Sequence, residues 1–156
     1  MRRYGSLVLL VLGALLAGCT PAGPAKPWVG TMLDALNADR AAAGAPPLQL
    51  CASLTRAAQG HSDDQAATNT MTHTGSDGSD IGSRADAAGY KGWTALGENV
   101  AMGYTTVDTV MTAWMNSTGH RANILNPSYH DVGLAESFAA DGTPYWTQDF
   151  GVGGTC

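Results

Sequence analysis

Apolar residues recur with helical spacing from Trp28 onward. One face of this segment is apolar at i, i+3, i+4 and i+7, and it consists of Val29, Met32, Leu33 and Leu36. Gly44 and the Pro46-Pro47 pair follow and end the helix. The pattern therefore predicts an amphipathic helix that begins near Trp28.

Two further helices and a long loop follow. A second helix is predicted over about Cys51–Thr68, where small and apolar residues form one stripe and charged residues form the others. Residues 70–80 are rich in Gly, Ser, Thr and Asp, which predicts a loop. A short third helix is predicted over Ile81–Ala88, with Ser79 or Asp80 as its N-cap.

The chain then changes from helical to strand-like patterns. Residues 94–104 predict a loop or a short strand, because glycines interrupt their apolar residues. A fourth helix is predicted after the N-cap Thr106, with Gly119 just past its end. Two runs rich in aromatic and β-branched residues, 132–139 and 144–152, are separated by a turn signal and predict a C-terminal hairpin. Helices followed by strands indicate an α+β fold with helices packed on an antiparallel sheet.

Composition narrows the class of protein. The chain has 156 residues, which is one domain's worth, and only 13% of them are charged. The formal net charge is −5, so few cations are available to neutralise phosphates, and nucleic acid is not an expected partner. The apolar content of 44% argues against intrinsic disorder. A multi-span membrane protein is excluded because the one long apolar run lies at the N-terminus.

The N-terminus has the pattern of an export signal. A basic start, Met1–Arg3, precedes the apolar stretch 7–17, which is too short to span a bilayer comfortably. The segment Leu16–Cys19 resembles a bacterial lipobox, in which the cysteine is acylated and becomes the mature N-terminus. The alternative is a plain secretory signal with a chance cysteine.

This start predicts the organisation of the chain. We expect a lipoprotein signal peptide over residues 1–18, a Pro-rich tether over residues 19–27, and one domain over residues 28–156. The protein would then be exported, as a monomer, and either held by a lipid on Cys19 at the outer face of the cell membrane or secreted.

Cysteine parity agrees with lipid attachment. Three cysteines in an exported chain leave one over. If Cys19 carries lipid, Cys51 and Cys156 remain and can form a disulfide outside the cytoplasm. The alternative is two free buried thiols.

The strongest general signatures of catalysis are missing from the sequence. It contains no H-E-x-x-H, C-x-x-C, G-x-S-x-G or Walker motif. The acidic segment Asp77–Asp80 lacks EF-hand spacing and is interpreted as a turn. Glu98, by contrast, lies in an otherwise apolar stretch, so we expect it to be partly buried and to need a partner, for which a histidine is the obvious candidate.

Four short motifs occur in a distinctive order. They are His73-Thr74-Gly75, Gly97-Glu98-Asn99-Val100, the segment from Trp114 to Leu125 (WMNSTGHRANIL), and the segment from Tyr145 to Gly151 (YWTQDFG). In this order they resemble a bacterial member of the CAP superfamily (cysteine-rich secretory, antigen 5, pathogenesis-related 1; also called SCP-like extracellular). The resemblance covers about residues 29–152 and implies an α–β–α sandwich, with an antiparallel sheet between helical layers.

The resemblance also implies a cavity over the sheet that can hold a divalent cation. By position, its histidines are His73 and His120, and its carboxylate is Glu98. Many eukaryotic members have a second glutamate where this chain has Ser117, which leaves the acid/base set incomplete. Tyr145 and Gln148 would border the same cavity.

Several chemical interpretations of these residues remain open. Two imidazoles and a carboxylate, with water, match an open zinc site. Glu98 can instead orient a histidine ring, or His73, Glu98 and His120 can form a hydrogen-bonded network that fixes loops on the sheet. Ser117 and His120 are three residues apart and could touch, which would be needed for a Ser–His nucleophile pair.

The remaining histidines and tryptophans have simpler interpretations. His61 lies on an alanine-rich helix face and is expected to be a packed or capping residue. His130 is expected to be a turn residue, and Trp114 and Trp146 are expected to belong to the core.

Three functions follow from the resemblance. The first is a binding module for a lipid, a small apolar ligand or a component of the cell envelope. The second is a metal-dependent or His/Glu-dependent hydrolase of the peptidase kind. The third is a structural or signalling envelope protein with a vestigial cavity. We expect the first, without established catalysis.

Overall fold

The structure is a computed structural model that describes residues 26–156. The expected signal peptide, the expected lipidation site Cys19 and most of the expected tether lie outside these residues. Pro27, which the sequence assigned to the tether, is the first residue of the first helix. Proline is well tolerated there, because the first helical nitrogen has no intrahelical partner to lose.

The described residues form five helices and four strands. Their bounds are α1 (Pro27–Ala42), β1 (Gln49–Leu50), α2 (Ala52–Thr68), α3 (Ile81–Ala87), β2 (Ala95–Met102), α4 (Val107–Asn116), α5 (Thr118–Leu125), β3 (Asp131–Phe138) and β4 (Pro144–Val152). Two predicted N-caps are confirmed, since the side chain of Asp80 accepts from Ser83 N and that of Thr106 accepts from Thr109 N.

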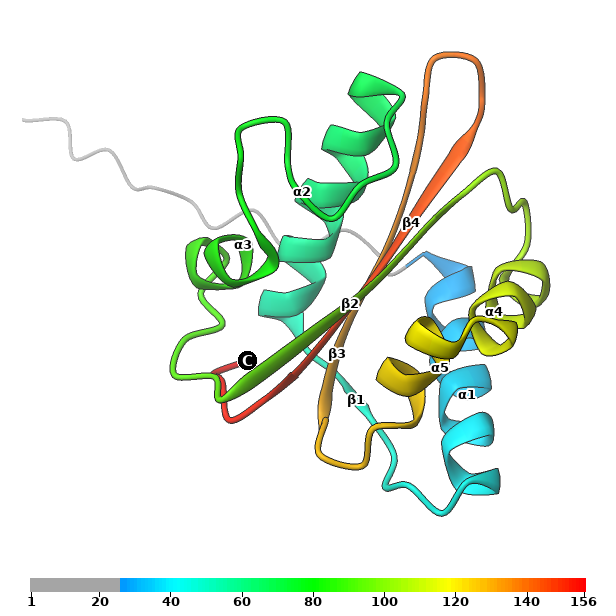
Figure 1. Ribbon diagram of the computed structural model, residues 1–156, viewed down its shortest axis with the longest axis vertical. Coiled ribbons are helices and arrows are strands. Elements are labelled where there is room, and N and C mark those ends of the chain that lie inside the picture. The colour runs from blue at the N-terminus through cyan, green and yellow to red at the C-terminus, as the bar shows by residue number, and fades with distance from the viewer. Residues whose placement is uncertain (1–25) are drawn as a thin grey trace, which may run out of the picture.

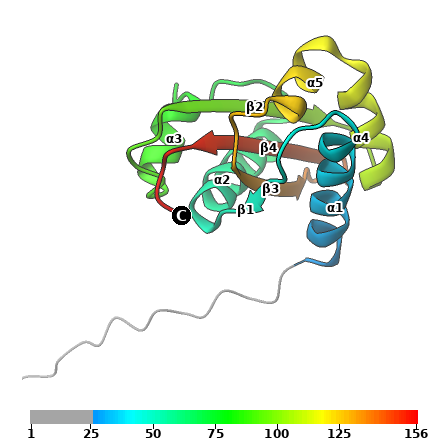
Figure 2. The same ribbon diagram turned by 90° about the horizontal axis from the view of Figure 1, so that it is seen from below.

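The helices cover both faces of one four-stranded sheet. The strands lie in the order β1-β3-β4-β2. In Figures 1 and 2, α2 and α3 lie on one side of the sheet, and α1, α4 and α5 lie on the other. The expected α–β–α sandwich is therefore confirmed. One detail differs, because β1 pairs with β3 in parallel and makes the sheet mixed. A two-residue strand is too short to leave a pattern in the sequence.

Two predictions about the middle of the chain were wrong. Residues 95–102 form a full eight-residue strand, where a loop or a short strand was expected. Gly119 does not follow the end of a helix but lies in the first turn of α5, which was not predicted. Ser117 takes an extended conformation between α4 and α5 and separates the two helices. The segment that follows has no apolar periodicity to reveal a new helix.

The apolar core lies on the face of the sheet that α1, α4 and α5 cover. It joins helix residues and strand residues, which include Met32, Leu36, Trp114, Ile124, Val132, Leu134, Trp146 and Phe150. Trp114 and Trp146 are 1% and 2% exposed, so the prediction that both belong to the core is confirmed.

The opposite face of the sheet contains a buried polar layer beside two small apolar clusters. Its buried strand residues include Glu98, Thr147 and Asp149, and α2 faces them with His61, Ser62 and Gln65. Helix α2 also lies very close to β3, because a Cβ on Gly133 would overlap the backbone of Leu54. This polar layer between α2 and the sheet holds the groups from which chemistry can be built.

A buried arginine fixes α5 on the other face. The Arg40 side chain is 0% exposed and donates to the carbonyl oxygens of Ile124, Asn126 and Tyr129, at 2.7, 2.9 and 3.0 Å. These carbonyls belong to the end of α5 and to the loop after it, where the helix leaves oxygens unpaired. Arg40 on α1 therefore holds the helix that carries His120.

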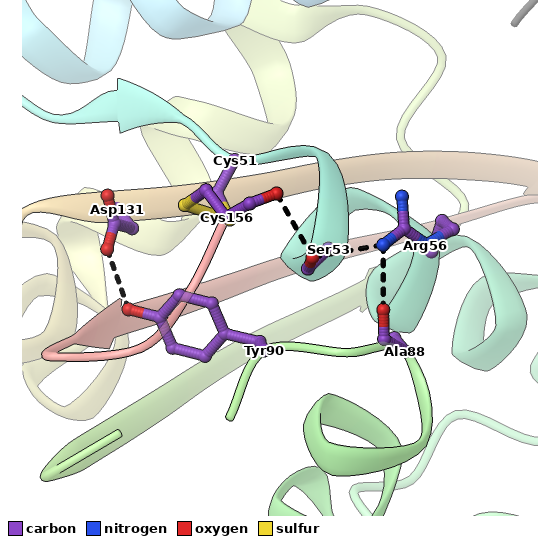
Figure 3. The surroundings of a disulfide bond; sticks show 7 residues. All are labelled: Cys51, Ser53, Arg56, Ala88, Tyr90, Asp131 and Cys156. Carbon is purple, nitrogen blue, oxygen red and sulfur yellow. Dashed lines mark hydrogen bonds between the residues drawn. A yellow bond between two sulfur atoms is a disulfide. The ribbon is translucent and has the colours of Figure 1, made fainter. Parts of the chain in front are cut away.

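A disulfide ties the end of the chain to the start of α2. Cys51 and Cys156 are bonded, with their Cα atoms 5.1 Å apart and 105 residues of chain between them. Figure 3 shows Ser53 beside this bond, where its hydroxyl donates to the Cys156 carbonyl and accepts from Arg56. The predicted pairing of these two cysteines is thus confirmed.

Within residues 26–156, no helix combines the length and apolar character needed to cross a membrane.

Candidate functional site

The site is built where the loop after α2 passes the edge strand β2. Helix α2 ends at Asn69, which has a left-handed backbone with φ of 51°. Two side chains of α2 then hold the backbone of Thr72. Gln65 Oε1 accepts from Thr72 N at 3.2 Å, and His61 Nε2 lies 2.7 Å from Thr72 O. This double contact places His73, the next residue, over β2.

Glu98 is the centre of the site. Its side chain is 4% exposed, and each of its oxygens meets a nitrogen donor. Oε1 lies 2.7 Å from His73 Nδ1, and Oε2 accepts from Arg84 Nη2 at 2.6 Å. A buried carboxylate is costly unless it is paired and hydrogen-bonded, so these contacts explain how the sheet accommodates it. The predicted His–Glu98 contact is present and involves His73.

Arg84 also shapes the loop that carries His73. Its guanidinium donates to Ser79 O at 2.9 Å and to His73 O at 3.3 Å, in addition to Glu98. One planar cation therefore fixes the carboxylate and two points of the loop. Arg84 was not predicted to belong to the site, because Asp80 and Asp86 are closer to it in the sequence than Glu98.

A second carboxyl group lies beside Glu98. Asp149 is 0% exposed and is the cross-strand partner of Glu98 on β4. The Glu98 carbonyl accepts from Asn123 Nδ2 at 3.1 Å on the free edge of β2, so it points away from β4. Glu98 and Asp149 are therefore a non-hydrogen-bonded pair of the antiparallel ladder. In such pairs the facing side chains lie closest. Burial first, and then the charge of Glu98, raise the pKa of Asp149 well above its usual range.

His61 completes the polar layer from the side of α2. The residue is 1% exposed, and its Nε2 lies 3.8 Å from Glu98 Oε2. Because Nε2 contacts the Thr72 carbonyl, it must carry the hydrogen, and Nδ1 is then an acceptor in the neutral ring. Burial lowers the pKa of His61. The residue is packed, as expected from the sequence, and it also stands beside the carboxylate.

His120 approaches the same edge from the other layer. It lies on α5, and its backbone carbonyl accepts from Asn99 Nδ2 at 3.2 Å. Burial, together with the nearby charge of His73, lowers the pKa of His120. Of the two histidines in the motifs, only His73 is hydrogen-bonded to Glu98 among the described residues.

An apolar pocket of about 280 Å³ adjoins His120. Its lining residues are Met71, Val100, Ala101, Met102, Tyr104, Ala113, Trp114, Ser117 and His120. Met71, Met102 and Tyr104 are 46%, 46% and 37% exposed, which is unusual for large apolar side chains. The pocket therefore has an apolar floor and mouth, with a hydroxyl and an imidazole at one side.

Three other expected members of the site lie differently. Ser117 lines the pocket with His120, but residues 26–156 contain no hydrogen bond between the two side chains. Tyr145 packs against Ala66 and Ala139 and is the cross-strand partner of Met102, but it does not itself line the pocket. Gln148 is 0% exposed and bonds Asn99 and the sulfur of Met111 on the core face. The expectation that Tyr145 and Gln148 border the cavity of His73, Glu98 and His120 stays a prediction.

The donor set does not converge as a three-ligand zinc site would. Both oxygens of Glu98 face nitrogen donors, one of them a guanidinium. Across residues 26–156, no group of three or more His, Cys, Asp or Glu side chains is placed to hold a metal ion. His73 and His120 are then the two imidazoles left, which is fewer than the three protein ligands of an open zinc site.

Comparison with known proteins decides the family. The model of the cysteine-rich secretory protein family, CAP, matches residues 33–150. The chain belongs to the CAP family. Its CAP domain is 36% identical over 121 residues to the protein YkwD of Bacillus subtilis, across 76% of this chain and 45% of that protein. The chain therefore spans less than half the length of this curated relative.

Solved structures agree with the CAP fold. An outer surface protein from Borrelia burgdorferi has a TM-score of 0.75 and 20% identity, over 81% of this chain and 92% of that chain. An extracellular protein containing a SCP domain from Bacillus anthracis has a TM-score of 0.69 and 27% identity, over 83% of this chain and 44% of that chain. The family resemblance drawn from four short motifs is therefore confirmed, and so is the fold.

Proposed function

We propose that this CAP domain is exported, carries lipid on Cys19, and binds a small amphipathic molecule in the pocket beside His120. Export is supported by the basic and apolar start of the chain. It is also supported by the outer-surface and extracellular proteins that share the fold. The pocket would take the apolar part of the ligand, and His120 with Ser117 would face its polar group.

The main observation behind this proposal is that exposed apolar side chains gather at one pocket. Five large apolar residues are exposed in residues 26–156, and Met71, Met102 and Tyr104 among them line this one pocket. Exposed apolar surface that gathers at a concave site is typical of ligand binding. A cavity of about 280 Å³ is near the lower end of common ligand pockets, which suits a single alkyl chain or a small ring system.

The test is to identify what accompanies the protein from its native membrane. The full chain would be purified from that membrane, and its organic extract compared by mass spectrometry with that of Ala113→Phe, in which the new ring fills the pocket. Ala38→Phe on α1 is the matched control, because this alanine is also helical and is exposed. We expect one class of lipid or small apolar molecule with the wild type and the control, and its loss in Ala113→Phe. An extract that is the same for all three would contradict the proposal.

A second candidate function is hydrolysis, and one observation favours it. The 2.7 Å contact between His73 Nδ1 and Glu98 Oε1 is the carboxylate–imidazole arrangement that orients a general base. His73 is 60% exposed on its side chain, so substrate could reach its other nitrogen. However, no serine or cysteine of residues 26–156 is bonded to His73 as a nucleophile would be.

Peptide substrates and chelation separate the two functions. Binding without catalysis predicts no turnover of a mixed peptide library by the wild type, before or after EDTA treatment. Turnover that is lost in His73→Ala and Glu98→Gln, and kept in Ala113→Phe, would instead establish the hydrolase and displace the binding proposal.

A further inference from the structure

A second cavity lies on the side of the sheet that α2 and α3 cover. It has a volume of about 420 Å³, is open to solvent, and is bordered by α2, α3 and the loop of residues 75–79, which lie side by side in Figure 1. Its walls are lined by Arg56, Ala57, Gly60, His61, Asp64, Gly75, Ser76, Asp77, Ser79, Arg84, Ala87 and Ala88. Two of its lining residues, His61 and Arg84, also belong to the Glu98 site, and the cavity shares no lining residue with the pocket beside His120.

The charges along this cavity are separated. Arg56, Gly60 and Asp64 follow each other at i, i+4 and i+8 on α2 and therefore form one stripe. Eight residues of helix place Arg56 and Asp64 about 12 Å apart along the axis. Asp77 on the loop lines the same cavity and adds a second carboxylate. The cavity thus has a guanidinium at one end of the α2 stripe and a carboxylate at the other.

Both charged groups keep hydrogen-bonding capacity for a ligand. Arg56 uses Nη2 for Ser53 Oγ and Ala88 O, while a guanidinium has five N–H donors on three nitrogens. Asp64 accepts from the amide and the hydroxyl of Ser76, while a carboxylate offers about four lone-pair sites. The Ser76 contacts hold the Asp64 carboxylate against the loop, and its remaining sites are free for an amine.

The middle of the stripe is open because of a glycine. Gly60 lies inside α2, where glycine costs about 0.5–1 kcal/mol relative to alanine. A Cβ at this position would meet no atom within 4 Å, so no packing contact requires the glycine. Its effect is to widen the cavity between the two charged ends.

We propose that this cavity binds a short zwitterionic peptide, with its carboxylate at Arg56 and its amine at Asp64. A di- or tripeptide spans about 7–10 Å when extended, which is comparable to the separation of about 12 Å between the two positions along α2. The alanines of α2 and α3 and the missing side chain of Gly60 leave room for small peptide side chains. This site is independent of the proposed ligand at His120.

Calorimetric titration of the full chain tests the proposal. The probe is L-alanyl-L-alanine, and two analogues each lack one charge: N-acetyl-L-alanyl-L-alanine and L-alanyl-L-alaninamide. We expect the dipeptide to bind and each analogue to bind at least 10-fold more weakly. No binding of the dipeptide at about 10 mM would overturn the proposal, since that corresponds to less than about 3 kcal/mol of affinity. Equal binding of all three probes would overturn it too.

Variants locate the binding. Gly60→Leu should abolish binding by filling the cavity, and leucine favours the helix, so the fold should hold. Gly30→Leu on α1 is the matched control, because a Cβ there also meets no atom within 4 Å. Arg56→Gln should weaken binding of L-alanyl-L-alanine by about 10-fold and leave the affinity for L-alanyl-L-alaninamide unchanged. Binding that survives Gly60→Leu, or that is lost equally in Gly30→Leu, would contradict the location.

Discussion

Glu98 and Asp149 lie directly opposite each other on β2 and β4, and both carboxyl groups are buried. Like charges in such a pair are destabilising, so the pair needs either a cation or a proton. Arg84 and His73 supply donors to Glu98. Asp149 has no partner for either oxygen among residues 26–156, and its pKa is raised by burial and by Glu98. The structure therefore favours an Asp149 that keeps its proton beside a paired Glu98.

Asp149→Asn should stabilise the protein at neutral pH. The unfolded aspartate loses its proton near its ordinary pKa, while the folded one keeps it to a higher pH. The free energy of unfolding of the wild type therefore falls as pH rises from about 4 toward the raised pKa of Asp149. The asparagine cannot ionise and has no such loss. Denaturant unfolding at pH 7.5 should show a gain of about 1 kcal/mol or more for the variant.

Asp34→Asn on α1 is the control for this comparison, because Asp34 is exposed. Its unfolding free energy should stay within about 0.5 kcal/mol of the wild type at every pH. An Asp149→Asn variant that is less stable than the wild type at pH 7.5, with the same pH profile, would show that Asp149 is ionised in the fold.

His61 should make the protein less stable in mild acid. Burial lowers its pKa, so below about pH 6.5 the unfolded chain takes up a proton that the folded chain does not. His61→Gln stays neutral and can still donate to Thr72 O. The variant should lose stability at pH 7.5, and its deficit relative to the wild type should shrink by about 1 kcal/mol by pH 5.5. A deficit that is equal at both pH values would refute this role.

The Tyr129 side chain, which packs over the edge of β2, should leave no room for a side chain at position 97. Tyr129 donates its hydroxyl to Leu96 O at 2.9 Å, and a Cβ on Gly97 would lie 2.6 Å from that hydroxyl oxygen. Gly97→Ala should therefore cost about 1–3 kcal/mol of unfolding free energy. The cost should be smaller in the Tyr129→Phe background, because the hydroxyl is gone. A double-mutant cycle measures this coupling, and strictly additive effects would contradict the contact.

Reduction of the Cys51–Cys156 bond should destabilise the domain strongly. A bridge over 105 residues restricts the unfolded chain, and the loop-entropy relation gives about 5 kcal/mol. Urea unfolding with and without a reductant measures the loss. The Cys51→Ser/Cys156→Ser variant should match the reduced wild type and be insensitive to reductant. A wild type whose midpoint is unchanged by reduction would contradict a role for the bridge in stability.

Much of the fold was visible in the sequence because its signals are local. Residues close together in the sequence determine the N-caps Asp80 and Thr106, the periodicity of α1 and the hairpin of β3 and β4. Helix α5 and strand β1 were missed for the opposite reason. Their stability comes from distant contacts, such as the four carbonyl oxygens that Arg40 holds, and these leave no local pattern.

The site was predictable only as far as its motifs reached. His73, Glu98 and His120 were identified by order and resemblance, and the burial of Glu98 followed from its apolar neighbours. The motifs could not tell which histidines bond to Glu98. Arg84 and Asp149 were missed because their roles depend on the register of β2 against β4 and on the packing of α3. Both are long-range features that a single sequence does not display.

The most direct test of the account is a titration of the full chain with dodecanoate, followed by NMR of the His120 ring and the Trp114 indole. Both side chains line the pocket of about 280 Å³. The account predicts saturable shifts of both signals in the wild type and in Ala38→Phe, and none in Ala113→Phe. Unchanged His120 and Trp114 signals at saturating dodecanoate, or equal shifts in Ala113→Phe, would contradict ligand binding at this edge of the sheet.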